Sequence, residues 1–478
     1  MLKYPDNAHR GQNAQSHVFV NYRLQSPVMR GIEFEVIREV LGHTTRLMSL
    51  VLLYCAVQST LTTGRGAMSN SVRLGSFGIL RLILCISLPV TSVAFAQNAA
   101  ARPSVPWPTK GWTKGTPASV GLDEKVLLSF DDELASGKYM LIDSFHVFRC
   151  GEEVFARTYA HDYGQIYGKE AKTKGPLNAR LTGPYNYFDP YWHPFYHGTD
   201  MHSMQSVSKT VTSVIYGIAI MRGDFKAGLD TPVLKFFDEA RVKNVDDRKR
   251  RITLKNVLTM TTGLEWNEEV PYDDPRSDSS LMEATDDWVQ YVIDKPMASE
   301  PGKVFNYSSG ATELLAYIFQ KETGQDIDDY GDKYLFTPLG IKHHWKRTYL
   351  GVVDTEGGLY LNGENLAKIG YLYLHGGMWE GKQIVSKEWV KESLTPYIDA
   401  REGSEPFKYG FKWWLYPVGE KFVWMARGFG GQRLMVFPDE NLITVFTGWE
   451  IIKDDAPAGD LVKRLLPAVR PTECAGSN

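Results

Sequence analysis

Cysteine and metal-binding motifs are scarce in this chain of 478 residues. Only four cysteines occur, and Cys150 and Cys474 are the two that lie beyond residue 100. No C-x-x-C or H-E-x-x-H motif is present, and the histidines do not follow the spacing of metal ligands. The sequence therefore predicts no metal and no organic cofactor. In an exported chain, Cys150 and Cys474 can form a disulfide or remain two free thiols, and both alternatives stay open on sequence alone.

An excess of positive charge is also absent. Residues 97–478 hold 44 lysines and arginines against 52 aspartates and glutamates, which gives a net charge of −8. Nucleic-acid phosphates bind surfaces of the opposite sign, so this balance argues against nucleic acid as a partner. The one strongly basic run, Arg248–Arg251, follows two aspartates and is typical of a solvated loop.

The N-terminal region contains a signal-peptide pattern but no clear membrane span. The apolar run at residues 47–57 is too short for a confident span, although it leaves an alternative anchor open. Met68 is followed by Arg73, an apolar run at residues 79–93, and the small-x-small site Ala94-Phe95-Ala96. We therefore predict that residues 1–96 are an N-terminal extension plus signal peptide, with the signal at about 68–96. Residues 97–478 then form one secreted or periplasmic domain without a stable membrane span.

Apolar periodicity predicts strands near both ends of this domain and helices between them. The predicted strands are 144–149, 154–159, 423–425, 434–437 and 442–446. The predicted helices are 123–134, 253–260, 287–293, 311–321, 366–374, 387–394 and 459–469. This order predicts an α/β (α+β) fold, with an antiparallel sheet built from both chain ends and flanked by helices. A mainly helical region is inserted between the two sets of strands.

Ser206 and Lys209 form the only S-x-x-K pattern in the sequence. Apolar residues recur at helical spacing from Val207 to Ile218, which places Ser206 in the first turn of a buried helix and Lys209 one turn later on the same side. A serine hydroxyl is a weak nucleophile until a base accepts its proton, and a buried lysine can be that base. The pair therefore predicts a serine hydrolase. The alternative is a capped helix with a solvated lysine.

A second segment, Pro301–Gly310, contains Tyr307 and Ser309 after a Pro-Gly turn. With S-x-x-K, this segment resembles the serine β-lactamase and penicillin-binding-protein superfamily, in particular its class C-like branch of esterases, peptidases and 6-aminohexanoate-dimer hydrolases. The resemblance extends over roughly residues 120–469 and includes residues 253–264 and 357–360. It implies that the Tyr307 phenol passes a proton to the leaving group. It also places Ser309 at the third position of Y-x-N or Y-x-S; the alternative for Ser309 is the N-cap of the helix at Ala311.

The third motif of the superfamily is altered in this chain. The resemblance places Ala426, Arg427 and Gly428 where K-T-G or H-x-G stands in relatives, so the cation that binds a β-lactam carboxylate is missing or is replaced by Arg427. By the same correspondence, the backbone N–H groups of Phe429 and Ser206 form the oxyanion hole.

These patterns predict a serine hydrolase that cleaves a small-molecule ester or amide, including short linear amides, through an acyl-enzyme. One alternative is a β-lactamase or D,D-peptidase that acts on peptidoglycan-like substrates. Another is a non-catalytic penicillin-recognising protein, which the intact Ser206, Lys209 and Tyr307 argue against. Aromatic residues at 185–196 predict a pocket wall or lid, or else a long loop packed against the core. The sequence makes no prediction of oligomeric state.

Overall fold

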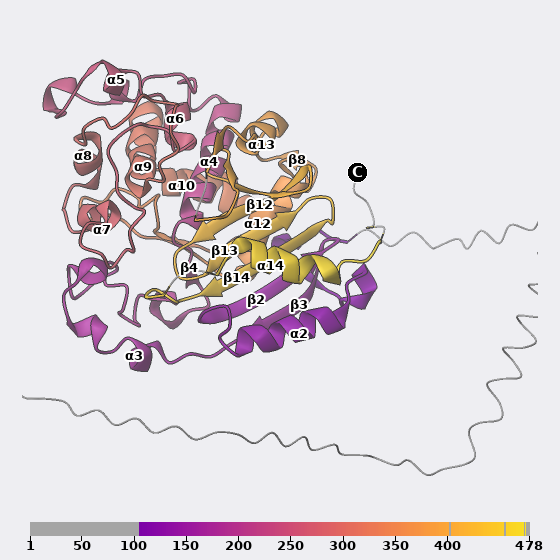
Figure 1. Cartoon of the computed structure of the whole chain (residues 1–478). Coiled ribbons are helices and arrows are strands. Elements are labelled where there is room, and N and C mark those ends of the chain that lie inside the picture. The colour runs from indigo at the N-terminus through magenta and orange to yellow at the C-terminus, as the bar shows by residue number, and fades with distance from the viewer. Residues whose placement is uncertain (1–104, 401–402, 454–455, 473, 475–478) are drawn as a thin grey trace, which may run out of the picture. The chain divides into compact units, whose positions relative to one another are not determined.

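A nine-stranded sheet crosses the part of the chain that the computed structural model describes, which is residues 105–400, 403–453, 456–472 and 474 (Figure 1). The strand order is β1-β3-β2-β14-β13-β12-β11-β10-β9. All neighbours pair antiparallel except β1 and β3. Strand β2 (Ile142–Arg149) pairs with β14 (Leu442–Gly448), which joins the two ends of the domain and confirms the predicted architecture.

The remaining strands of this sheet are β1 (Thr113–Lys114), β3 (Glu152–Thr158), β9 (Ile398–Asp399), β10 (Lys408–Tyr409), β11 (Trp414–Val418), β12 (Lys421–Gly428) and β13 (Gln432–Phe437). Two small sheets lie outside it. The first has the order β4-β6-β5, from β4 (His202–Ser203), β6 (Leu359–Leu361) and β5 (His344–Trp345), and the second pairs β7 (Met378–Trp379) with β8 (Lys382–Gln383).

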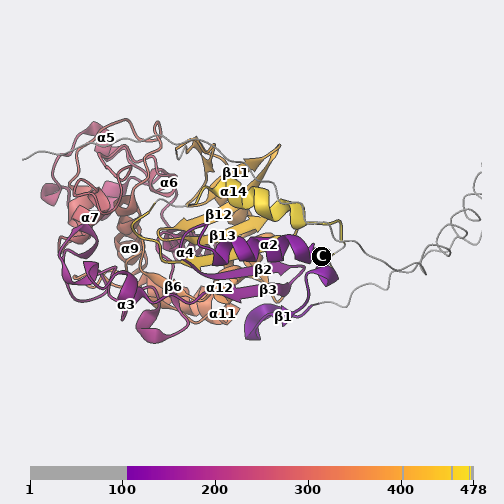
Figure 2. The ribbon, with the colours of Figure 1, turned by 60° about the horizontal axis from the view of Figure 1, so that its bottom comes forward.

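Helices cover both faces of the large sheet. On one face, α2 (Glu124–Ala135) and α14 (Ala458–Leu465) lie side by side, as Figure 2 shows. Helix α2 begins at the Asp123 cap and buries an apolar stripe, Leu127, Phe130 and Leu134, at helical spacing. On the other face, α12 (Gly363–Leu374) packs on β2, β13 and β14. The sheet therefore separates two apolar cores, and the inserted helical region joins the core on the α12 side.

The predicted helices are all present, with small shifts at their ends. The other α-helices are α3 (Tyr163–Ile166), α4 (Val207–Arg222), α5 (Asp247–Arg250), α6 (Leu254–Leu258), α7 (Asp278–Glu283), α8 (Trp288–Ile293), α9 (Ser309–Thr323), α10 (Ile327–Gly331), α11 (Thr337–Leu339) and α13 (Lys387–Ser393). A π-helical turn spans Asp332–Phe336. Short 3-10 turns lie at Pro108–Lys110, Ala118–Val120, Glu170–Lys172, Pro176–Asn178, Tyr196–Gly198, Val233–Phe236, Glu239–Arg241 and Leu466–Ala468. The last predicted helix is shorter than expected, because Pro467 cannot donate a helical hydrogen bond and the final turn becomes 3-10.

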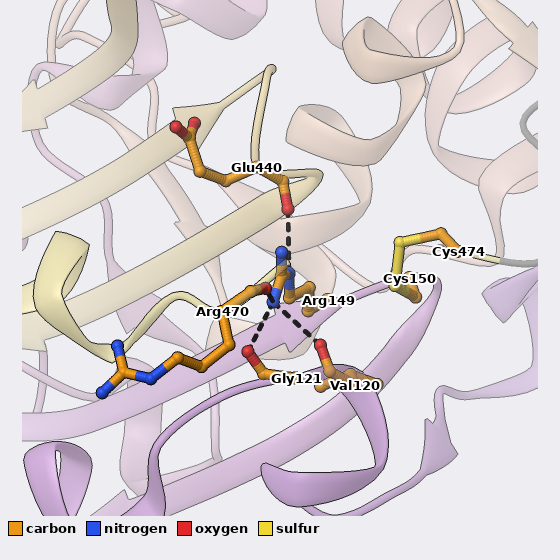
Figure 3. The surroundings of a disulfide bond; sticks show 7 residues. All are labelled: Val120, Gly121, Arg149, Cys150, Glu440, Arg470 and Cys474. Atoms are coloured by element: carbon orange, nitrogen blue, oxygen red, sulfur yellow. Dashed lines mark hydrogen bonds between the residues drawn. A yellow bond between two sulfur atoms is a disulfide. The ribbon is translucent and has the colours of Figure 1, made fainter. Parts of the chain in front are cut away.

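A disulfide between Cys150 and Cys474 attaches the end of the chain to the sheet (Figure 3). The two Cα atoms are 5.0 Å apart, so of the two alternatives left open by the sequence the structure has the pair. Next to it, the Arg149 guanidinium donates hydrogen bonds of 2.8–3.0 Å to the carbonyl oxygens of Val120, Gly121 and Arg470. The disulfide and Arg149 together fasten both ends of the domain at one corner of the sheet.

The predicted signal peptide from Met68 to Ala96 lies outside the described residues. Within the described ranges, no helix combines the length and the apolar character needed to cross a membrane.

Candidate active site

Ser206 lies at the N-cap of α4, directly after the short strand β4. The backbone N–H of Met204 donates to Leu359 O at 2.8 Å, which ties this turn to β6. The Ser206 side chain makes no capping hydrogen bond, and its Oγ instead lies 2.8 Å from Lys209 Nζ. Lys209 is only 1% exposed. The alternative of a capped helix with a solvated lysine is therefore wrong.

Lys209 has two further acceptors, both on Glu356. Its Nζ donates to the Glu356 carbonyl oxygen at 2.7 Å and to Glu356 Oε2 at 3.3 Å. Glu356 lies in the segment just before β6, about 150 positions away in the sequence. The sequence analysis noted the following Gly357-Gly358 pair but missed Glu356, because nothing in the local pattern indicates which helix the segment meets.

Tyr307 lies just before α9, and its ring centroid is 5.3 Å from Lys209 Nζ. The ring stacks against Trp414, with 5.5 Å between the ring centroids. Burial raises the pKa of the Tyr307 phenol well above its usual range, and the negative charge of Glu268 raises it further, while the hydrogen bond with the Ser206 side chain acts in the opposite direction. The phenol therefore keeps its proton at neutral pH.

Glu268, which the sequence analysis missed, fixes the position of Ser309. Its carboxylate accepts hydrogen bonds from Ser309 N, Ser309 Oγ, Trp266 Nε1 and the Tyr272 hydroxyl at 2.6–2.7 Å. Burial raises the pKa of Glu268, whereas the Lys209 charge and these donors lower it. The Ser309 hydroxyl thus points to Glu268, and the predicted role of Ser309 in substrate binding stays a prediction. The N-cap of α9 is Ser308, so the capping alternative for Ser309 is wrong.

Arg427, Gly428 and Phe429 follow one another where β12 ends beside the nucleophile. A Cβ atom at Gly428 would lie 2.3 Å from the carbonyl oxygen of Met204, so this close approach of two backbones requires glycine. The Arg427 guanidinium lies 5.1 and 5.4 Å from the ring centroids of Phe407 and Trp414. Ala426 is completely buried. The end of β12 therefore presents Arg427 and Phe429, rather than Ala426, to the space in front of Ser206.

That space is a cleft of about 880 Å³. It brings together five of the predicted site residues, Ser206, Tyr307, Arg427, Gly428 and Phe429, while Lys209 and Ser309 lie buried behind its wall. Aromatic rings and charged side chains share the rest of the lining, among them Tyr272, Phe305, Trp414, Glu269, Lys303 and Asp399.

The aromatic stretch 185–196 does not form the wall of this cleft. Tyr185, Tyr187 and Phe188 are buried, and Tyr187 and Phe188 pack with Trp449 and Ile451 in an apolar cluster. Of the two alternatives for this stretch, the structure favours packing against the core. Tyr187 also borders a small cavity of about 20 Å³ on the other side of Ser206.

A second buried lysine, Lys412, lies close to the site. Its Nζ donates to Thr312 Oγ1 at 3.0 Å, and only 1% of the residue is exposed. Burial lowers the pKa of Lys412 well below its usual range, and the charge of Lys209 lowers it further. Sequence reasoning missed this residue, although the surrounding run Tyr409–Trp414 is too apolar for a solvated lysine. Among the described residues, no group of three or more potential ligands could hold a metal ion.

Comparisons with known proteins give the family and the fold of this chain. The family model described as "Beta-lactamase" matches residues 144–448. A 6-aminohexanoate-dimer hydrolase from Paenarthrobacter ureafaciens is 24% identical over 270 residues, which cover 52% of this chain and 67% of the relative. A β-lactamase from Escherichia coli (strain K12) is 30% identical over 145 residues, which cover 30% of this chain and 34% of that protein.

Solved structures share the fold at low sequence identity. A putative 6-aminohexanoate-dimer hydrolase from Bacillus anthracis superposes with a TM-score of 0.51 at 16% identity, covering 76% of this chain and 87% of its own. The hydrolase EstCE1, described as having promiscuous acyltransferase activity, gives a TM-score of 0.53 at 13% identity and covers 72% and 97% of the two chains.

Proposed function

Because the chain belongs to the Beta-lactamase family, as the sequence resemblance predicted, we propose that it is a serine hydrolase that cleaves an ester or an amide through an acyl-enzyme on Ser206. The observation that carries the proposal is the 2.8 Å contact between Ser206 Oγ on the cleft surface and the buried Lys209 Nζ. A nucleophilic serine needs a hydroxyl that the substrate can reach and a base within hydrogen-bonding distance.

In the proposed reaction, Ser206 Oγ attacks the substrate carbonyl while Lys209 Nζ accepts its proton. The Tyr307 phenol gives its proton to the leaving alkoxide or amine, and the Lys209 ammonium restores it. Water then attacks the acyl-enzyme while the same groups act in reverse, which releases the acid and returns the Ser206 hydroxyl. The N–H groups of Ser206 and Phe429 are proposed to stabilise the oxyanion in both steps.

The shape of the cleft supports small esters and short linear amides as substrates. Tyr272, Phe305 and Trp414 offer apolar contact, while Lys303, Arg427, Glu269 and Asp399 offer charges of both signs. A linear amide with charged ends matches such a mixed lining, as the name of the Paenarthrobacter relative suggests. A β-lactam fits less well, because Ala426 has no charge and is buried.

We also propose that export removes residues 1–96. The mature protein then begins near Gln97, which mass spectrometry of its N-terminus tests.

A substrate screen of the purified protein tests the function. It compares p-nitrophenyl esters, short linear amides, nitrocefin and D-Ala-D-Ala peptides. For whichever substrate is turned over, Ser206→Ala should lower kcat by about 10⁴-fold or more, because the nucleophile is removed. Ser213→Ala is the matched control: the Ser213 hydroxyl is buried in the same helix and, in the described structure, has no hydrogen-bond partner. The proposal fails if Ser206→Ala keeps most of the activity of Ser213→Ala.

A further inference from the structure

Four carboxyl groups gather close to Lys209 of α4, beside a small cavity that Ser206 also borders. We name Glu283, Glu313, Asp354 and Glu356 the acidic cluster. Only two lysines form ion pairs with it in the described structure: Lys209 Nζ lies 3.3 Å from Glu356 Oε2, and Lys346 Nζ lies 3.7 Å from Asp354 Oδ2. Glu313, Asp354 and Glu356 are buried and Glu283 is half-buried. Even with both lysines charged, four carboxylates would leave two charges uncompensated. Because an unpaired buried charge is very costly, part of the cluster must hold protons.

The surroundings of each carboxyl group indicate where these protons reside. Burial raises the pKa of Glu283 well above its usual range, and the neighbouring Glu356 raises it further through its charge and a shared hydrogen bond. Burial and the Asp354 charge do the same to the pKa of Glu313. The pKa of Asp354 rises to about 6 through burial and the Glu356 charge. Protons in the cluster are therefore most favoured on Glu283 and Glu313, and Glu356 is the member that contacts Lys209.

Resting on the proposed function, we propose that Glu356 is a positioning residue that holds Lys209 against Ser206 and controls when the lysine can accept a proton. Two of the three acceptors of Lys209 Nζ belong to Glu356, its carbonyl oxygen at 2.7 Å and its carboxylate at 3.3 Å. The third acceptor is Ser206 Oγ. The geometry therefore stabilises the ammonium that forms when Lys209 takes the serine proton. Glu283 shares a hydrogen bond with Glu356, and its raised pKa favours the protonated form, which adds no second negative charge.

The groups that face Glu356 come from several elements. Lys209 is on α4, Glu283 on α7 and Glu313 on α9. Lys346 directly follows β5, and Asp354 lies on the segment before β6. Protonated phenols complete the shell, and they are Tyr185, Tyr187, Tyr272 and Tyr307. Among these neighbours Lys209 is the base of the proposed reaction. The pH profile of kcat/KM therefore reports how this shell acts on the proposed base.

The pH profile of kcat/KM for a p-nitrophenyl ester tests the inference, with wild type, Glu356→Gln, Glu283→Gln and Glu265→Gln compared. Glutamine keeps the shape of glutamate but removes the negative charge that favours the Lys209 ammonium. Glu356→Gln should therefore move the acid limb to lower pH by about one unit or more, with a lower plateau. Glu283→Gln replaces a neutral acid by a neutral amide, so its acid limb should stay in place. Glu265 is exposed on the segment that leads to the cleft, and its variant controls for a distant charge.

Glu356→Asp keeps the charge on a shorter side chain and should retain the wild-type acid limb at a reduced plateau, which a purely structural role does not predict. An acid limb that stays in place in Glu356→Gln overturns the inference, as does an equal shift in Glu283→Gln. Thermal unfolding confirms that each variant is folded before its profile is used. Ser206→Ala, measured in parallel, separates the two claims. If this variant is active, the proposed function is wrong. If it is inactive and the acid limb of Glu356→Gln is unshifted, only the role of Glu356 is wrong.

Discussion

The two sides of the α4 N-terminus differ sharply although Ser206 borders both. On one side lies the cleft of about 880 Å³, with aromatic rings and charged side chains that water reaches. On the other side lies a cavity of about 20 Å³ bordered by Glu283 and Glu356, followed by the acidic cluster. The difference indicates a division of labour in which the open side selects the substrate and the closed side controls the proton of Ser206. Substitutions on the open side should change ratios between substrates, and those on the closed side should change pH dependence and stability.

Tyr307 lines the cleft beside Ser206, and its variant should have a larger effect than the Arg427 and Lys412 variants. Tyr307→Phe removes the hydroxyl but keeps the ring that stacks on Trp414. We expect kcat to fall by about 10²–10⁴-fold with little change in thermal stability, because general acid–base catalysis contributes that much. Tyr409→Phe alters another tyrosine that contacts Trp414 and should keep most of the activity. Comparable rates for the two variants in a p-nitrophenyl ester assay would show that Tyr307 only packs.

Arg427 tests the open side alone. A charge-assisted contact with a substrate carboxylate is worth about 1.5–3 kcal/mol. Arg427→Gln should therefore lower kcat/KM for carboxylate-bearing nitrocefin by about ten- to a hundredfold relative to a neutral aryl ester. The ratio of the two substrates, measured on one sample, is independent of how much of the variant is folded. An unchanged ratio would mean that another residue holds the carboxylate, and Lys303→Gln is the first variant to compare.

Lys412 tests the buried surroundings of Lys209 through stability, where we expect the smallest effect. Its pKa is lowered in the folded protein, so the unfolded chain binds more protons than the native state between that lowered value and the usual value near 10.4. The free energy of unfolding of the wild type should therefore rise with pH across this window, by up to about 1.4 kcal/mol per pH unit from this group. Lys412→Met removes this contribution to the pH dependence of the free energy of unfolding.

The melting temperature of Lys412→Met should accordingly exceed that of the wild type by the largest margin at pH 6. This margin should shrink toward pH 10. Lys346→Met offers a contrast, because that buried lysine has an acidic partner, Asp354, at 3.7 Å. A difference that is independent of pH would show that Lys412 is charged in the native state.

The helices and strands of this structure were predictable from the sequence, because they depend on local residue patterns. Strand alternation and helical spacing depend on neighbours a few positions apart, so β2, β14, α2 and the nucleophile at the start of α4 followed from short patterns. Ser206, Lys209 and Tyr307 also belong to motifs whose spacing is visible. The structure places the three together, and their catalytic roles are the proposal to be tested.

The contacts of Glu268, Glu356 and Lys412 were not predictable, because each residue meets partners that are distant in the sequence; only the apolar run around Lys412 indicated its burial. Glu356 meets Lys209 across 147 positions, and Lys412 meets Thr312 across 100. No periodicity distinguishes such residues from ordinary loop residues. For the aromatic stretch at 185–196 the sequence left two alternatives open, because composition alone does not tell a ligand-binding wall from a loop that covers a core.

The most direct test of the central claim, that Ser206 is the nucleophile, is the site of covalent labelling by a fluorophosphonate. The wild-type protein is treated with the reagent, digested, and analysed by tandem mass spectrometry, and Lys209→Met is treated in parallel. One adduct per chain is expected, on Ser206, with much slower labelling in the lysine variant because the base is lost. An adduct on Ser208 or Ser309, or equal labelling rates in the two proteins, would contradict the assignment of Ser206 and Lys209 as nucleophile and base.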